Sequence, residues 1–357
     1  MAAIVAVIPA ISKDLAASDI VTARMIPYYM VPYGIGALLY APLARWVPFK
    51  TIMGLSMALY GLSNALCVTL TRLNPFLGAQ FLLGLTAAGV VPLGLMTIGK
   101  LFDYEIRGRL VGVFFSSSFL ASLVGIWLSG FANWRWLFSI PAFLGFLTSA
   151  AYFLARFSLI DRLQTTAVNY WETLKKQEIR NVFIFIFLIS LCFHAVHKWF
   201  GVYLSRFYLC DQKTISFFFI LMALSSVAGQ ILGGFLTDKK GRFPACLLGV
   251  LLLSLSTIAL VFEFPLFIVG IIFAFFSMGW TIGHNGVSTV LTDFPEEDRA
   301  EIASLNSSLR FLSGGLGFFI SGLFIEKSFG LTFLGFGILM LIFSVFLKRV
   351  IPDRKTI

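Results

Sequence analysis

Long apolar stretches alternate with short polar breaks along almost the whole chain. A membrane-spanning helix needs about 20 consecutive apolar residues, and stretches of at least about 18 are taken as full spans. The pattern then predicts eleven full spans, at residues 22–44, 51–70, 75–98, 110–131, 136–156, 181–205, 214–236, 243–262, 265–291, 302–325 and 329–347. The chain is therefore predicted to be an all-α membrane protein.

A shorter apolar segment, Met1 to Ile11, precedes these spans. As a helix, a segment of this length rises only about 16 Å, roughly half of a bilayer core of about 30 Å. We expect it to be part of a first helix that begins upstream of Met1, which gives eleven full spans plus a half. A short re-entrant segment is the alternative.

The longest polar stretch, residues 158–180, divides the chain. The predicted organisation is an N-terminal helical half at 1–157, a linker at 158–180 and a C-terminal six-helix half at 181–357. Among the Lys and Arg residues outside the spans, eighteen lie on the side of the linker and six on the other. Because cytoplasmic loops carry the excess of positive charge, the linker and the C-terminus are expected in the cytoplasm, and the protein in the cytoplasmic (inner) membrane.

Composition excludes an ordinary soluble enzyme, since 59% of the 357 residues are hydrophobic and only 12% are charged. The net charge of +10 would suggest a nucleic-acid partner in a soluble protein. Here the charges lie in short loops and act as orientation signals, so the bilayer is the expected partner and nucleic acid is not. The four cysteines follow no disulfide or metal-ligand spacing, and no metal or cofactor is predicted.

The two halves are similar at a nearly constant offset. Identical residues recur 190 to 193 positions apart, at the pairs Gly89 and Gly279, Asp103 and Asp293, Arg107 and Arg299, and Gly36 and Gly229. Registered similarity of this kind indicates two parallel repeats of six helices. Applied to the seventh helix, which begins near Asn181, the same offset places the start of the first helix roughly a dozen residues before Met1.

One loop of the second half reads Gly234-Phe-Leu-Thr-Asp238-Lys-Lys-Gly241-Arg242. Gly234 permits close helix packing, Gly241 allows a tight turn, and Asp238 offers an acceptor for hydrogen bonds. The loop resembles the G-x-x-x-D-x-x-G-R signature of the major facilitator superfamily. The resemblance implies two six-helix bundles that alternate in access, with this loop latching the cytoplasmic side in one state. Arg107 is assigned to the same conformational motif.

The first-half copy of the loop departs from that signature. Ala41, Arg45 and Pro48 stand where the family has Gly, Asp and Gly. Gln80 stands where the family often carries Arg in the fourth helix. The acid of the loop and the base of the fourth helix are therefore both absent, so an ion-pair latch in the first half is not expected.

Three further segments resemble the drug-antiporter-like branch of the superfamily, at residues 107–108, 125–130 and 133–138. The fifth helix lacks the Gly-Pro pair that is typical of antiporters in that branch.

Polar residues inside the predicted spans are the candidates for a transport site, because they are costly in hydrocarbon unless they face a cavity or a partner. His194, His197 and Lys198 follow three- and four-residue spacing and share one face of the seventh helix. Trp280 and His284 do the same on the tenth helix. The family resemblance implies that these helices line a central cavity. The alternatives are packing roles for the histidines and a Lys198 side chain that reaches the headgroups.

Arg310 lies deep in the eleventh helix, too far from its end to reach the headgroups easily. We expect it at a depth similar to that of His284, where the two hold an anionic or polar group of the solute. Trp280 is predicted to supply an apolar wall.

The 17 acidic residues can all be placed in loops or at helix ends. A cavity with Lys198, Arg310 and three histidines favours an anionic solute. His194, His197 and Lys198 are then predicted to contribute charge or proton coupling, since histidine titrates near neutral pH.

The sequence thus predicts a monomeric secondary active transporter for a small organic solute, with an anionic solute favoured. No nucleophile elbow, metal cluster or phosphate-binding loop on a soluble fold is present in the sequence, so an enzyme is not predicted. Two alternatives stay open. One is an exporter of drugs or lipid-like compounds, and the other is a non-transporting sensor or assembly protein with a carrier fold.

Overall fold

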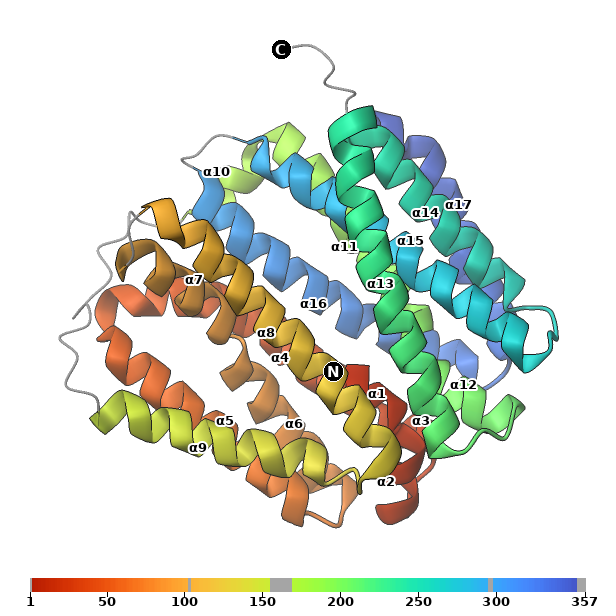
Figure 1. Ribbon diagram of the computed structural model, residues 1–357, viewed down its shortest axis with the longest axis horizontal. Coiled ribbons are helices and arrows are strands. Elements are labelled where there is room, and N and C mark those ends of the chain that lie inside the picture. The colour runs from red at the N-terminus through yellow and green to blue at the C-terminus, as the bar shows by residue number, and fades with distance from the viewer. Residues whose placement is uncertain (1, 102–103, 155–168, 295–297, 352–357) are drawn as a thin grey trace. The chain divides into compact units, whose positions relative to one another are not determined.

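A computed structural model describes residues 2–101, 104–154, 169–294 and 298–351, except for some side chains, most of them in α7 and the first part of α8. Within these ranges every regular element is a helix (Figure 1). The chain divides into two compact units, Met1–Asn169 with Ala303–Leu312, and Tyr170–Ile302 with Ser313–Ile357. The units are described separately below.

The first unit contains nine helices among its described residues, besides the segment of α16 that it includes. They are α1 (Ala2–Ala6), α2 (Ile8–Asp14), α3 (Asp19–Ala23), α4 (Met25–Trp46), α5 (Phe49–Thr69), α6 (Leu73–Ala87), α7 (Val90–Leu101), α8 (Tyr104–Phe131) and α9 (Trp136–Leu154).

The second unit contains the remaining described helices. They are α10 (Tyr170–Lys175), α11 (Gln177–His197), α12 (Phe200–Phe207), α13 (Gln212–Lys240), α14 (Arg242–Ala259), α15 (Leu266–Thr292), α16 (Arg299–Ile325, apart from the segment assigned to the first unit) and α17 (Phe329–Val350).

Each of the eleven predicted spans coincides with one helix or with two consecutive helices. Nine helical segments of the described chain are long and apolar enough to cross a membrane. This establishes an all-helical, multi-span architecture, whereas the count of eleven spans and a half stays a prediction.

Helix breaks divide several of the predicted spans, and the break between α6 and α7 shows how one is stabilised. A Cβ atom at Gly89 would lie 2.6 Å from the ring of Tyr40. The Tyr40 hydroxyl donates to the Thr86 carbonyl in the last turn of α6 at 3.4 Å, and Ser56 Oγ donates to Tyr40 at 3.1 Å. The buried Tyr40 side chain thus fills the space at the break and pairs with a backbone carbonyl beside it.

Small residues let the helices of each unit approach closely. In the first unit, a Cβ at Gly145 of α9 would lie 2.9 Å from the backbone of Gly61 in α5. In the second, a Cβ at Gly249 of α14 would lie 2.5 Å from the Gly283 backbone in α15. Such contacts are the usual way in which membrane helices pack. The contact between Gly249 and Gly283 holds α14 against α15, the helix that carries Trp280 and His284.

Hydrogen bonds to Asp14 join the turn before α9 to the end of α2, and we call this set of contacts the buttress on Asp14. Asp14 Oδ2 accepts hydrogen bonds from Trp134 Nε1 at 2.9 Å and from Arg135 Nη1 at 2.5 Å. The guanidinium of Arg135 also lies 4.4 Å above the Trp134 ring. The hydrogen bonds from Trp134 and Arg135 lower the pKa of Asp14 from its ordinary value. Trp134 and Arg135, which belong to the segment 133–138, therefore hold this turn against the end of α2.

Candidate functional site

Helices α11 and α15 bring three of the predicted site residues into a row within the second unit. The ring centroid of Trp280 lies 6.0 Å from that of His194 and 5.9 Å from that of His284. The His284 Nδ1 and Ser288 Oγ atoms are 3.3 Å apart, one turn further along α15. The indole therefore lies within 6.0 Å of two imidazoles, one on each of the two helices.

A second residue of α11, Phe193, connects this row to His197. The Phe193 ring stacks on Trp280 at 3.9 Å with an interplanar angle of 10°, and on His197 at 4.9 Å with an angle of 13°. Phe276 of α15 stacks on Phe193 at 5.2 Å. The result is an aromatic stack that runs between the two helices. Sequence reasoning missed Phe193 and Phe276, because nothing distinguishes them among the 40 phenylalanines of the chain.

His197 is enclosed by aromatic rings. Its imidazole stacks on Phe276 at 6.3 Å and meets Phe200 and Phe219 edge-on at 5.7 and 6.0 Å. Its Nδ1 atom is buried and has no hydrogen-bond partner among the described residues. A buried polar atom of this kind is costly, and such atoms are rare unless they have a function.

Lys198 follows directly, at the break between α11 and α12. The break is fixed by Trp199, whose Nε1 donates to Ser321 Oγ at 2.8 Å while its ring stacks on Phe318 at 4.4 Å. Lys198 is only 5% exposed and forms no ion pair with a carboxylate of the described chain. This burial argues against the alternative in which Lys198 reaches the headgroups.

Arg310 lies in the segment of α16 that belongs to the first unit. Its Nε donates to Asn306 Oδ1, one turn earlier, at 2.7 Å. The next residue, Phe311, stacks on Tyr33 with centroids 3.7 Å apart. Sequence reasoning missed Asn306, although its four-residue spacing from Arg310 was a signal. Arg310 and His284 belong to different units, so their shared site stays a prediction.

The motif predicted as a loop is mostly helical: residues 234–240 form the last turns of α13, Gly241 lies between the two helices, and Arg242 begins α14. Gly241 has a φ of 94°, which L side chains rarely adopt, and its N–H donates to the Thr237 carbonyl at 3.1 Å. Gly234 faces the Asn285 amide of α15, where a Cβ would have room at 3.7 Å. Asp238 is exposed. The turn thus depends on glycine at 241 more strictly than at 234.

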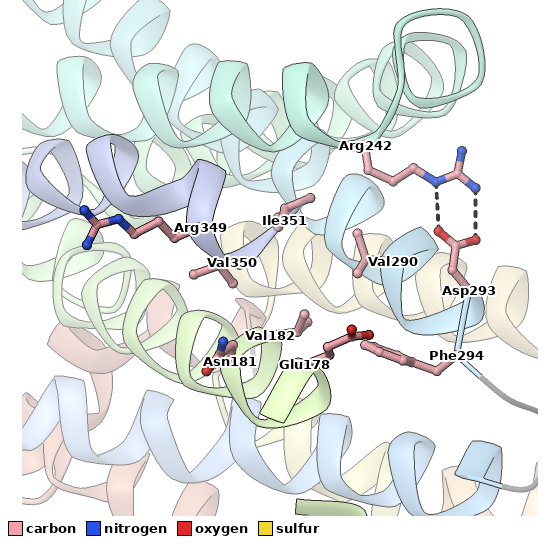
Figure 2. Close-up of a pocket in the computed structure, with 10 residues that line it drawn as sticks. All are labelled: Glu178, Asn181, Val182, Arg242, Val290, Asp293, Phe294, Arg349, Val350 and Ile351. Atoms are coloured by element: carbon pink, nitrogen blue, oxygen red, sulfur yellow. Dashed lines mark hydrogen bonds and ion pairs between the residues drawn. The ribbon is translucent and has the colours of Figure 1, made fainter. Parts of the chain in front are cut away.

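Arg242 forms a two-pronged ion pair with Asp293 at the end of α15. Its Nε and Nη2 atoms each donate to one carboxylate oxygen at 3.0 Å (Figure 2). A pocket of about 120 Å³ adjoins the pair and is lined also by Glu178 of α11 and Arg349 of α17. Asp293 entered the sequence analysis only as a repeat match. Its counterpart Asp103 and the side chain of Arg107 lie outside the described part of the chain.

Comparison with known proteins decides the family. The family model of the Major Facilitator Superfamily matches residues 1–318. The chain belongs to the Major Facilitator Superfamily. This transporter is 22% identical over 328 residues to the uncharacterized MFS-type transporter YwfA of Bacillus subtilis (strain 168), across 88% of this chain and 79% of YwfA.

Two further similarities place this transporter among known carriers. It is 33% identical over 117 residues to the multidrug transporter protein MdtP of Bacillus subtilis (strain 168), across 32% of this chain and 20% of MdtP. A crystal structure of a mutant of the nucleoside transporter NupG superposes with a TM-score of 0.77 at 12% identity, across 97% of this chain and 94% of NupG. The chain is a multi-pass integral membrane transporter with the fold of this superfamily.

Proposed function

We propose that this transporter moves a small organic solute with an anionic group across the cytoplasmic membrane by alternating access. The observation that carries the proposal is Lys198, which is 5% exposed and has no carboxylate partner among the described residues. An ammonium group inside a membrane protein is costly unless a partner compensates its charge. An anionic solute supplies such a partner during each transport cycle.

The row of His194, Trp280 and His284 supports this proposal through its chemistry. The two imidazoles offer hydrogen bonds to a carboxylate or phosphate, and the indole between them offers an apolar face to the body of the solute. Arg310, a cationic residue inside the helix α16, is proposed as a further contact for the anionic group.

Proton coupling is proposed to use histidine. His197 has a buried Nδ1 atom without a described hydrogen-bond partner and lies next to Lys198 in the chain. The occupancy of the solute site then changes the electrostatic environment of the imidazole, which titrates near neutral pH in its unperturbed form.

The cytoplasmic latch is proposed to consist of Gly234, Asp238, Gly241 and Arg242, with Arg107 contributing from the first half. The bidentate pair between Arg242 and Asp293 supports a role for this loop in holding the ends of α14 and α15 together. In this proposal the linker and the C-terminus are cytoplasmic, the membrane is the inner one and the transporter acts as a monomer.

Uptake into proteoliposomes tests the proposal. Purified transporter is reconstituted and assayed with a panel of radiolabelled organic carboxylates. The Lys198→Gln variant is expected to reduce uptake at least tenfold, and Lys198→Arg to keep part of it. The matched control is Lys327→Gln, which removes an exposed lysine of the same unit. Unchanged uptake by Lys198→Gln would contradict the anionic site.

Export of hydrophobic drugs is the second candidate. The similarity to MdtP favours it, and the partly exposed indole of Trp280 offers an apolar contact to flat hydrophobic compounds. Efflux of ethidium from cells that express the transporter separates the candidates. Efflux that persists in Lys198→Gln but fails in Trp280→Ala would support drug export over anion transport.

A further inference from the structure

The first unit contains a pocket of about 310 Å³ that none of the proposed solute contacts lines. It is lined by residues of α1, α4, α5, α6, α8 and α9, all of them within the first unit. Its volume is at the lower end of ligand pockets, which measure about 300–1,000 Å³. The pocket is therefore large enough for a small molecule.

Buried amides line this pocket. Asn64 and Gln80 are 2% and 1% exposed. Asn64 Nδ2 donates to the Tyr60 carbonyl at 2.9 Å, and Gln80 Nε2 makes only a long contact to Cys67 Sγ at 3.5 Å. The Asn64 side chain also hydrogen-bonds the Tyr60 side chain, whereas the carbonyl oxygen of Gln80 has no hydrogen bond to a described residue. Buried amides normally satisfy such acceptors, so Gln80 offers a free acceptor to a ligand in the pocket.

Two phenols complete the polar part of the lining. Tyr29 of α4 and Tyr60 of α5 both line the pocket, and the Tyr29 hydroxyl has no hydrogen bond to a described residue. A phenol both donates and accepts. Together with the amides, it offers a ligand a matched set of donors and acceptors.

None of the described residues that line the pocket is charged, and the remaining surface includes Leu83, Leu137 and Phe138. A charged ligand would stay uncompensated there at high cost. A neutral ligand with an apolar body and one or two hydroxyl or carbonyl groups meets both parts of the lining.

The wall formed by α8 consists of the small residues Ala121, Ser122 and Gly125. Ala121 and Ser122 are exposed in the described structure, while a Cβ at Gly125 would meet Ala3 at 3.3 Å. A larger side chain at Ser122 can therefore fill the pocket without replacing a buried hydrogen-bonding group.

We propose that this pocket is a binding site for a small neutral amphiphile that carries hydroxyl or carbonyl groups. It shares no residue with the anion site proposed above. Its ligand accepts from or donates to Tyr29 and Gln80, while its apolar body packs against the leucines and Phe138.

Ligand-observed saturation-transfer NMR on the full chain in lipid nanodiscs tests this site. The neutral probes are 4-hydroxybenzamide, 4-hydroxyacetophenone and 2-phenylethanol, and the charged isostere is 4-hydroxybenzoate. At least one neutral probe is expected to bind saturably, and 4-hydroxybenzoate much more weakly. Gln80→Leu is expected to weaken the binding about two- to tenfold, as for the loss of one hydrogen bond, and Ser122→Phe to abolish it.

Gln230→Leu, an exposed glutamine of α13 in the other unit, is the matched control and is expected to bind as the unaltered chain does. Thermal unfolding shows whether each variant is folded. If Gln80→Leu does not fold, ligand binding by Ser122→Phe still tests the proposal. Binding that survives Ser122→Phe, equal binding of 4-hydroxybenzoate, or no saturable binding of any neutral probe would overturn the proposal. The last outcome would leave water as the partner of the Gln80 carbonyl. None of these readouts depends on transport, so failure of this site and failure of the anion transporter are distinguishable.

Discussion

Phe193 lies flat against Trp280, with ring centroids 3.9 Å apart and planes 10° apart. The contact joins α11 to α15, and it also places His197 on the other side of the same phenylalanine at 4.9 Å. The Phe193 ring therefore contacts both Trp280 and His197, which are candidate site residues from two different helices. Because Phe193 is only 6% exposed, its ring acts as an internal spacer of the second unit.

Removal of this spacer is expected to destabilise the protein. Phe193→Ala should lower the free energy of unfolding by about 3–5 kcal/mol, the usual cost of deleting a buried phenylalanine ring. Phe193→Leu, which keeps most of the volume, should cost less. The measurement is thermal unfolding in detergent. Phe143→Ala removes a 67% exposed ring of α9 and serves as the control. Equal effects of Phe193→Ala and Phe143→Ala would contradict the role of the stack.

The ion pair of Arg242 and Asp293 is expected to matter for transport more than for folding, since both side chains are about a third exposed. Arg242→Gln and Asp293→Asn should each slow uptake several-fold and leave the unfolding temperature nearly unchanged. The exchanged pair, Arg242→Asp with Asp293→Arg, should recover part of the rate. Arg242→Gln with Asp293→Asn completes a double-mutant cycle with the two single variants and the unaltered protein, and their initial uptake rates measure the coupling. Additive effects without recovery would show that the two residues act independently.

Gly241 is expected to be intolerant of any side chain. Its φ of 94° and ψ of 174° lie in a region essentially restricted to glycine, where another residue costs about 1–3 kcal/mol, and the turn between α13 and α14 depends on it. Gly241→Ala should therefore lower the free energy of unfolding of the second unit by about that amount. Gly335→Ala is the matched control, because a Cβ there meets nothing within 4 Å and the residue lies in the helix α17. Chemical unfolding in mixed micelles compares the two. A loss at both positions would contradict the conformational argument.

The buttress on Asp14 predicts a pH dependence of stability. Since hydrogen bonds from Trp134 and Arg135 lower its pKa, the carboxylate stabilises the folded state above the unfolded pKa of about 3.9. This contribution is lost as the pH falls through the lower, folded pKa. Asp14→Asn should therefore be less stable than the unaltered protein at pH 7, and the difference should shrink toward pH 3. Glu326→Gln, at an exposed residue, controls for general charge effects. A difference that stays constant down to pH 3 would contradict the prediction.

Much of the helical architecture could be predicted from the apolar pattern, because hydrophobic length alone decides where a chain can span a bilayer. The breaks at 88–89 and 198–199 were not predicted, although Pro92 was a signal for the first, because a proline cannot donate a hydrogen bond to the carbonyl of Ala88, four residues earlier. No proline lies near the second break, and each break is stabilised by a distant side chain, Tyr40 in one case and the Trp199 contact to Ser321 in the other. Such breaks depend on tertiary contacts that periodicity does not report.

The candidate site was predictable only where polar residues stood out in an apolar helix. His194, Trp280 and His284 were found in this way, and the structure brings them together. Phe193 gave no such signal, since one phenylalanine among 40 differs from the others only in what it touches. Asp293 was visible as a repeat match, but its bond to Arg242 crosses 51 positions of sequence.

Because aromatic rings enclose His197, we expect its replacement by another aromatic residue to abolish proton coupling and to preserve solute binding. His197→Phe removes the titratable group but keeps an aromatic ring against Phe193, Phe276 and Phe219. It also removes a buried Nδ1 atom that has no hydrogen-bond partner among the described residues. The variant should therefore fold at least as stably as the unaltered protein.

Exchange of solute across the membrane without a pH gradient should persist in His197→Phe, whereas stimulation of uptake by an imposed gradient should disappear. Uptake into proteoliposomes with and without the gradient measures both properties. Gradient stimulation that is unchanged in His197→Phe would remove this histidine from the coupling mechanism, and loss of exchange together with coupling would assign it to solute binding instead.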